Sequence, residues 1–276
     1  MIHYKRALVF LFLFASATVT QAADYRILIT NDDGIESPLL IALTEALRKD
    51  YQVVVSAPRE NQSGSSHASS SSTPLKVEKI SRDNAFFGYG VHGRPADAAR
   101  FGILQLGKDQ PFDVVISGIN RGSNVGKVSH LSGTVGAAME GLYHGLPAIA
   151  VSQDVRANTE LSIQLTKQVV EHFQQHGALQ GTLISINVPA GDVKEVVVKP
   201  MGGSYLGFRP FQVIEDEGED NITTYQGGWA VASTDENDND TRAYQQGKAT
   251  ITPLKLDWTD YQSLKTIQQW DLKVSP

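Results

Sequence analysis

Short runs of apolar, β-branched residues alternate with helical segments along the first two-thirds of this chain, and this alternation constrains the fold more than any other feature. Residues 26–30 (RILIT) and 51–56 (YQVVVS) have the composition of strands. Between them, apolar residues recur at helical spacing from Leu39 to Leu47, with Ser37 as a possible cap and Pro38 in the first turn. A strand, a helix and a strand within about thirty residues predict parallel strands joined by a right-handed crossover.

The same alternation continues to about residue 190. The expected helices cover residues 95–106, 134–144 and 160–176, and the expected strands cover residues 113–117, 148–152 and 182–188. Short apolar strands between helices are typical of a buried sheet with helices on both faces. The sequence therefore predicts a three-layer, Rossmann-like α/β core with a mostly parallel sheet over about residues 26–190.

The pattern changes after Pro189, where strand-like runs are joined by glycine-containing and acidic segments. We expect a β-hairpin-rich C-terminal appendage over about residues 191–276. Its acidic patch, residues 235–240, lacks the spacing of an EF-hand loop, and we expect a solvated loop there instead of a calcium site. A serine-rich run at residues 63–73 is typical of a flexible loop.

The first residues have the three parts of a secretory signal peptide. A basic start precedes an apolar run over residues 7–15, and small residues follow near Ala22. We therefore expect residues 1–22 to be a signal peptide and residues 23–276 to be an exported protein, periplasmic or secreted. The alternative is an uncleaved membrane tether. No later stretch has the ~20 apolar residues of a membrane helix, so we expect no membrane contact after signal removal.

Composition limits the ligands that such a chain can use. The 276 residues include no cysteine, so a bound metal must have oxygen or imidazole ligands. The formal net charge is −6, and an acidic surface disfavours polymeric nucleic acid, whose binding requires many phosphates to be neutralised. A small phosphorylated ligand is compatible with this charge because local geometry outweighs net charge.

Three polar loops leave from the carboxyl ends of predicted strands, where open α/β sheets bind their ligands. The first contains the adjacent pair Asp32 and Asp33, directly after the first strand. Two neighbouring carboxylates repel each other, and a hard divalent cation relieves that repulsion while it presents open positions to water and to a phosphate oxygen. The alternative is a simple turn, since Asn-Asp-Asp-Gly is also good turn chemistry.

The other two loops offer neutral oxygen ligands and an anion site. Asn61 and Ser63, after the second strand, can reach the same edge with an amide and a hydroxyl, although a solvated polar loop is the alternative. Ser132, Gly133 and Thr134 form a helix start whose unpaired N–H groups favour an anion. An ordinary capped helix would use the same residues. The glycine-containing segment before them lacks the spacing of a P-loop.

Four segments, taken together, closely resemble the SurE family, the stationary-phase survival proteins that are 5′/3′-nucleotidases. In chain order they are ILITNDDGIESPL, VVSAPRENQSGSSH, DVVISGINRGSNVG and HLSGTVGAAMEGLYHGLPAIAVS. The resemblance covers residues 26–189 and, more loosely, residues 240–254. It implies a Rossmann-like core, hydrolysis of nucleoside 5′- and 3′-monophosphates to nucleoside and phosphate, and one divalent cation, Mg²⁺ or Mn²⁺, per subunit.

The resemblance also implies roles for particular residues, with Asp32 and Asp33 as the catalytic pair. The residues expected to bind the metal are Asp32, Asp33, Ser63 and Asn120. The residues expected to bind the phosphate are Asn61, Ser132, Gly133 and Thr134. The expected partners are a nucleotide substrate and further copies of this chain, in a homodimer or higher homo-oligomer with exchanged C-terminal arms.

Three features depart from the family pattern. The family is generally found in the cytoplasm, whereas residues 1–22 predict export. Arg94 stands where the family usually has a small or hydroxyl residue, and Ala98 stands where cysteine is frequent. The last two departures concern the fit of the substrate more than the chemistry.

Two other functions compete with this interpretation. An exported nucleotide- or metal-binding protein without turnover would bind its ligand saturably and release no phosphate. A phosphatase of the haloacid dehalogenase type would have Asp-x-Asp after the first strand, and the adjacent Asp32 and Asp33 count against it. His67, His92 and His130 lie in or near the candidate loops and could protonate a leaving alcohol, or they are ordinary surface histidines.

Overall fold

A computed structural model of the protein describes residues 25–70, 72–217, 222–232 and 235–274. The predicted signal peptide, residues 1–22, lies outside these ranges. Within them, no helix combines the length and the apolar composition needed to cross a membrane.

The core is a nine-stranded sheet. In spatial order its strands are β3 (Lys76–Arg82), β4 (Ala85–His92), β2 (Gln52–Pro58), β1 (Arg26–Thr30), β5 (Val114–Arg121), β6 (Ala148–Gln153), β7 (Thr182–Val188), β11 (Ala249–Lys255) and β8 (Val196–Val198). The six strands from β4 to β7 in this order run parallel, while β3 and β11 are antiparallel to β4 and β7. The prediction of a mostly parallel α/β sheet is confirmed.

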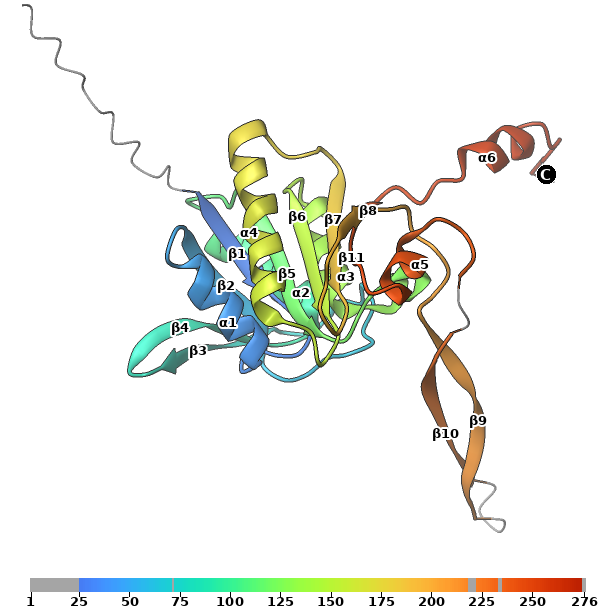
Figure 1. Ribbon diagram of the computed structural model, residues 1–276, viewed down its shortest axis with the longest axis horizontal. Helices are drawn as coiled ribbons and strands as arrows, with labels where there is room; N and C mark the ends of the chain where they lie inside the picture. Colours follow the sequence, from blue (N-terminus) through green and yellow to red (C-terminus); the bar gives the residue numbers. More distant parts are fainter. Residues whose placement is uncertain (1–24, 71, 218–221, 233–234, 275–276) are drawn as a thin grey trace, which may run out of the picture.

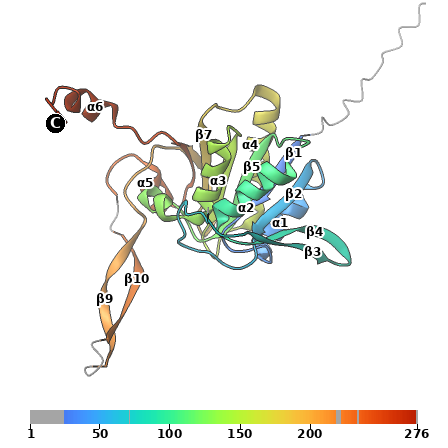
Figure 2. The same cartoon turned by 180° about the vertical axis from the view of Figure 1, so that it is seen from behind.

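Helices cover both faces of the sheet, which gives the predicted three layers (Figure 1). On one face α1 (Pro38–Leu47) and α4 (Thr159–His176) share a buried cluster with the strands, in which Leu43 and Ile163 join Ile29. On the other face lie α2 (Pro95–Phe101) and α3 (Gly133–Tyr143), which pack against each other (Figure 2). The core therefore consists of two apolar layers, one on each side of the sheet.

Most predicted core elements are present, with boundaries that differ by a few residues. The helix expected over residues 95–106 is α2 followed by a π-helical turn, Gly102–Leu106. The strand expected over residues 113–117 continues as β5 to Arg121, with a shift in its pairing to β6 between Ser117 and Asn120. Ser37 stands at the start of α1, but its side chain makes no capping hydrogen bond.

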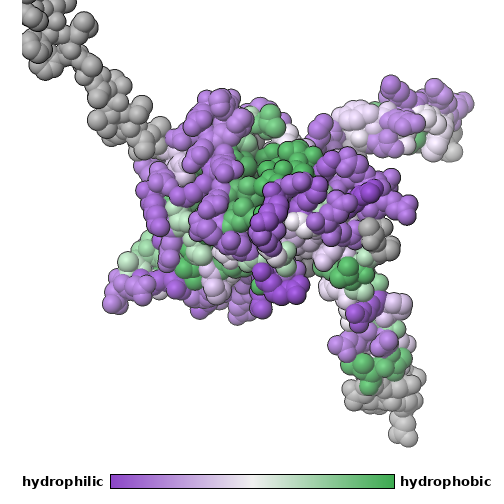
Figure 3. All heavy atoms as spheres, viewed as in Figure 1, coloured by the Kyte–Doolittle hydropathy of each residue, from purple (hydrophilic) through white to green (hydrophobic). Residues whose placement is uncertain are grey.

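The C-terminal part has a hairpin, as predicted, and also returns to the core. The long strands β9 (Leu206–Glu217) and β10 (Ile222–Val231) form a separate two-stranded sheet, pair with no other strand of the described residues, and extend away from the main sheet (Figure 1). Figure 3 shows hydrophobic residues on this hairpin and in a groove beside α4. After the short helix α5 (Asp240–Gln245), β11 enters the main sheet between β7 and β8, and the chain then leads to the exposed helix α6 (Tyr261–Ile267).

Asp240 fastens this part of the chain to the core. Its side chain is buried and accepts hydrogen bonds from the backbone N–H groups of Gly202 (2.7 Å) and Gly126 (3.1 Å). The prediction that the whole acidic patch is a solvated loop is therefore wrong for Asp240, because buried N–H groups of two loops need an acceptor there.

The order of the strands reverses around β1. The chain passes from β1 to β2 on one side, whereas β5 pairs with β1 on the other side. At such a reversal the loops after the two central strands diverge and leave a crevice at the carboxyl edge of the sheet. The loops after β1 and at the end of β5 carry most of the predicted metal ligands.

Candidate active site

A tight turn after β1 presents the two aspartates. Asn31 is fully buried, and its side-chain amide binds Gly34 twice: Nδ2 donates to the carbonyl of Gly34 (2.9 Å), and Oδ1 accepts from its N–H (3.2 Å). Gly34 has a φ of +97°, a conformation that favours glycine. The sequence predicted good turn chemistry here but assigned no role to Asn31, which closes the turn and fixes the positions of Asp32 and Asp33.

Asp32 is a buried carboxylate at this turn, with 3% of its surface exposed. Its Oδ1 accepts a hydrogen bond of 2.5 Å from the hydroxyl of Thr134 at the start of α3. Burial raises the pKa of Asp32 to about 6, with a smaller contribution from the charge of Asp33, while the Thr134 hydrogen bond opposes the rise. The carboxylate form is therefore costly in this environment unless a positive charge comes close.

Asp33 faces two other loops. Its Oδ2 accepts a hydrogen bond from the backbone N–H of Arg121 (2.9 Å), and its Oδ1 lies 3.4 Å from Nδ2 of Asn61. Burial raises the pKa of Asp33 as well, and the N–H and the charge of Arg121 oppose that rise. The loop after β2 and the end of β5 thus meet at one carboxylate, as the sequence predicted.

The other two predicted metal ligands lie next to these contacts. Ser63 donates its backbone N–H to Oδ1 of Asn61 (3.0 Å), and Asn61 in turn contacts Asp33. Asn120 precedes Arg121 on β5, and its Nδ2 donates to the carbonyl of Gly122 (2.7 Å). This bond orients the amide of Asn120 and leaves its Oδ1 as an acceptor.

The start of α3 packs directly on Asp32. Ser132 caps the helix by accepting a hydrogen bond from the N–H of Val135 (3.2 Å). At Gly133 a Cβ would come within 3.0 Å of Oδ2 of Asp32 and 2.6 Å of Oγ of Ser65, so only glycine fits without displacing them. The predicted phosphate site and the aspartate pair are therefore neighbours.

The serine-rich loop is held on α3 and on the 3-10 helix that precedes it, Gly126–Leu131. Ser66 donates its hydroxyl to the carbonyl of His130 (2.7 Å), and Nε2 of His67 lies 2.7 Å from Oε2 of Glu140. Glu140 is buried and also accepts a hydrogen bond of 2.6 Å from Nε of Arg100. A flexible loop was expected from its serine content, and that expectation is wrong for residues 65–67, because their contacts with α3 fix the backbone.

The structure also places His92 and the two residues that depart from the family pattern, Arg94 and Ala98. His92, at the end of β4, binds Glu78 (2.7 Å). Arg94 donates to Oε1 of Gln62 (2.9 Å), in the loop that carries Ser63. Ala98 is buried in α2, where its carbonyl accepts the hydroxyl of Ser56.

The donor set fits a hard divalent cation. No group of three His, Asp or Glu side chains that could hold a metal is found among the described residues. The candidate ligands are instead two carboxylates, one hydroxyl and one amide, and neither Asp32 nor Asp33 forms an ion pair within the described part of the chain. Adjacent carboxylates of which one, Asp32, is buried are unfavourable without an ion-pair partner, and Mg²⁺ or Mn²⁺ prefers oxygen ligands of this kind.

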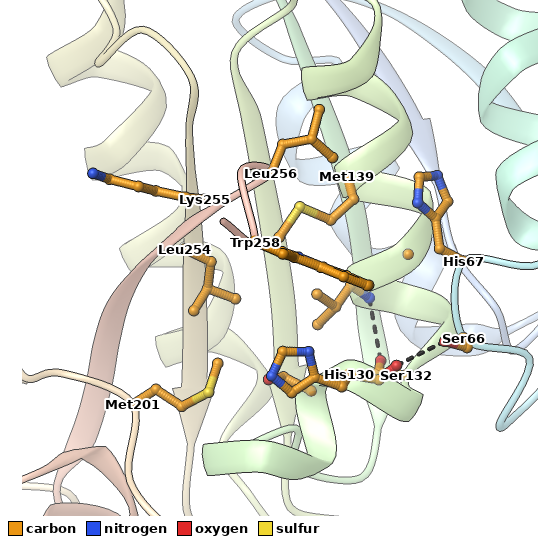
Figure 4. A pocket seen from close by; sticks show the side chains of 13 residues that line it. Ser66, His67, His130, Ser132, Met139, Met201, Leu254, Lys255, Leu256 and Trp258 are labelled. Carbon is orange, nitrogen blue, oxygen red and sulfur yellow. Dashed lines mark hydrogen bonds between the residues drawn. The ribbon is translucent and has the colours of Figure 1, made fainter. Parts of the chain in front are cut away.

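Two clefts adjoin the site. One is lined by Asp33, Asn61, Arg121 and Gln153. The other begins at Ser132 and extends along α3 to Trp258 (Figure 4). An acidic pair with one buried member stands beside a helix start, at the edge where a parallel sheet reverses its strand order. This arrangement defines the class of open α/β proteins that bind their ligands at the carboxyl edge of the sheet.

Comparison with known proteins identifies the family within this class. The family model described as "Survival protein SurE" matches residues 27–206, and the chain belongs to the SurE family.

Relatives of this chain match over nearly their whole length. The 5′-nucleotidase SurE of Rhodopirellula baltica is 34% identical over 254 residues, which cover 90% of this chain and 99% of that protein. The 5′-nucleotidase SurE of Pseudoalteromonas atlantica is also 34% identical, over 90% of this chain and all of its own length. The crystal structure of the SurE protein from Aquifex aeolicus superposes with a TM-score of 0.75 at 32% identity, covering 88% of this chain and 98% of that one.

The predicted export is wrong. The matching relatives are SurE 5′-nucleotidases, a family that is generally cytoplasmic. The prediction rested only on the composition of residues 1–22. A basic start and a short apolar run are compositional signals, and they do not by themselves show that a chain is exported.

Proposed function

We propose that this chain is a 5′-nucleotidase, a phosphoric monoester hydrolase that releases nucleoside and phosphate from nucleoside 5′-monophosphates and also from 3′-monophosphates. The observation that carries the proposal is the buried Asp32 carboxylate, which lies against Asp33 on one side and the start of α3 on the other. Relatives about one-third identical over nearly the full length are named 5′-nucleotidases.

Four side chains would hold the cation: Asp32, Asp33, Ser63 and Asn120. A divalent cation bound by them would supply Lewis-acid activation of the phosphoryl group and of the attacking water. The chain's own contribution is positioning. Asn31 fixes the turn, Thr134 orients Asp32, and the N–H of Arg121 orients Asp33.

The phosphate would lie at the start of α3, held by Ser132, Gly133 and Thr134, with Asn61 beside Asp33 on the other wall. Free backbone N–H groups at a helix start stabilise negative charge that develops on the phosphoryl oxygens. The side chain at residue 133 must be absent for the start of α3 to lie this close to Asp32.

The test is phosphate release from a panel of nucleoside 5′- and 3′-monophosphates, with Mg²⁺ or Mn²⁺ and with a chelator, for the wild type and for Asp32→Asn. We expect release that requires the metal and that falls by at least about a hundredfold in the variant. Full activity in the chelator, or an unchanged variant, contradicts the metal-dependent mechanism. Saturable nucleotide binding without any phosphate release would instead indicate a binding protein.

We also infer that the chain forms a homodimer or a higher homo-oligomer through its C-terminal arms. The hairpin exposes large apolar side chains: Phe208 is 67% and Phe211 73% exposed. An exposed apolar surface of this kind is typical of an interface. The measurement is the mass in light scattering of Phe208→Ser/Phe211→Ser, which should be lower than that of the wild type. Leu104→Ser, at a 54% exposed position on the core, is the matched control.

A further inference from the structure

The second cleft beside the site has an apolar floor and one aromatic wall. Its apolar part is formed by Met139 on α3, Met201, and Leu254 and Leu256 at the end of β11. Trp258 lies at its centre in Figure 4, between these residues and the start of α3. The cleft therefore offers a surface for a flat, apolar group.

Trp258 is open to a ligand. Its side chain is 75% exposed, and its ring meets His130 edge to face with 5.9 Å between the ring centroids. No other aromatic pair of Trp258 is found among the described residues. Such an indole keeps a free face, and base–aromatic stacking contributes to nucleotide binding whichever base is bound.

The cleft is continuous with the proposed phosphate site. Ser132 belongs to the wall of the cleft and is also the cap of α3. A ligand whose phosphate lies at this helix start therefore has its organic part beside Trp258. The opposite cleft, at Asp33 and Asn61, has no aromatic side chain in its lining and instead has the charged Arg121.

We propose that this cleft is the subsite for the nucleobase and that Trp258 stacks on the base. The proposal rests on the function proposed above and names the part of the substrate that the cleft takes. Two polar side chains on the cleft wall already have protein partners: the Ser66 hydroxyl donates to His130, and His67 binds Glu140. The side chain of Lys255 extends away from Trp258 (Figure 4). The area of the base that stacks on Trp258, and not hydrogen bonding to the base edges, then determines the affinity for the nucleotide. Purines, which have two fused rings, therefore bind more tightly than pyrimidines.

The first experiment compares AMP with ribose 5-phosphate, which has the same phosphate and sugar but no base. Trp258→Ala should raise KM for AMP about tenfold, with kcat little changed, and should leave ribose 5-phosphate hydrolysis unchanged. Trp258→Phe should restore most of the affinity because it keeps an aromatic face. Trp270→Ala is the matched control, since Trp270 is a 58% exposed indole on the same C-terminal segment and does not line the cleft.

Equal effects of Trp258→Ala on AMP and ribose 5-phosphate overturn the proposal, because a missing base cannot lose a stacking contact. A lower oligomer mass together with equal effects on both substrates means that the indole packs on a second copy of the chain, and this also overturns it.

A second measurement separates the subsite from the proposed catalysis. Adenosine, which has no phosphate to hydrolyse, should quench tryptophan fluorescence of the metal-free protein, and the quench should be absent in Trp258→Phe. Quenching without phosphate release from any substrate supports the subsite and contradicts the proposed enzyme. Phosphate release with no quench, and with AMP kinetics unchanged in Trp258→Ala, contradicts the subsite alone.

Discussion

The hydroxyl of Thr134 donates a hydrogen bond of 2.5 Å to Oδ1 of Asp32, and it thereby joins residues 102 positions apart in the sequence. This bond connects the start of α3, where the phosphate would lie, to the carboxylate that would bind the cation. A displacement of either group is transmitted to the other.

Thr134→Val tests this connection, because valine keeps the shape of threonine and removes the donor. We expect kcat/KM for nucleoside monophosphates to fall about ten- to a hundredfold, since the carboxylate loses the bond that orients it. Thr134→Ser keeps the hydroxyl and should stay within a few-fold of the wild type. If valine and serine behave alike, the hydroxyl does not position Asp32.

Asp32→Asn should make the metal-free protein more stable at neutral and alkaline pH. The pKa of Asp32 in the folded protein, about 6, lies above its ordinary value of 3.8, so folding favours the protonated form. The stability that protonation provides is complete below the ordinary pKa and is lost as pH rises through about 6, which amounts to about 3 kcal/mol.

The measurement for Asp32→Asn is urea unfolding in a chelator at several pH values. The variant should exceed the wild type by up to about 3 kcal/mol near pH 8 and by little near pH 4. A difference that does not change with pH would show that the Asp32 carboxylate is not the cause.

Gly133→Ala should reduce activity more than stability. The added Cβ would lie 3.0 Å from Oδ2 of Asp32 and 2.6 Å from Oγ of Ser65, so the start of α3 or the loop must shift. We expect kcat/KM to fall at least about tenfold, since small displacements of catalytic groups are costly. Gly228→Ala is the control, because nothing lies within 4 Å of its Cβ position.

Glu140→Gln should weaken both the fold and the metal site. Although burial raises its pKa, hydrogen bonds from His67 and Arg100 hold the pKa of Glu140 below its usual value, so it is a carboxylate near neutral pH. The variant removes the charged acceptor of Arg100 and leaves this partly exposed guanidinium with Asp97 (3.7 Å), which should cost about 1 to 2 kcal/mol in urea unfolding.

The same variant loosens the loop that carries Ser63, because His67 loses its charged partner. We therefore expect half-maximal activity to require several-fold more Mg²⁺ or Mn²⁺. Glu45→Gln, at an exposed position on α1, is the control for the loss of one negative charge. An unchanged metal requirement in Glu140→Gln would show that the loop holds Ser63 without this contact.

Much of the core was predictable from the sequence because local patterns determine it. The apolar runs at β1 and β7 are buried on both faces, and such strands have a composition that differs clearly from helices and loops. The hairpin of β3 and β4 was not predicted. Its strand β3 has two apolar residues, Val77 and Ile80, among charged and polar ones at the edge of the sheet, none of them buried, and this composition also suits a loop.

The site was predictable only in part. Asp32, Asp33 and Asn61 could be placed at one edge because parallel strands end there together. The contact of His67 with Glu140 joins a loop to the middle of a helix 73 residues away, and no local pattern encodes such a pair. The same holds for Trp258, which approaches α3 only because β11 returns to the sheet.

The position of β11 also has a consequence for synthesis of the chain. β7 and β8 are both made before β11, the strand that separates them in the sheet. Until residues 249–255 leave the ribosome, β7 has an unpaired, apolar edge that can pair with other chains. The nascent protein therefore depends on rapid completion, and ribosomes that stall before this strand should yield aggregates instead of a shortened enzyme.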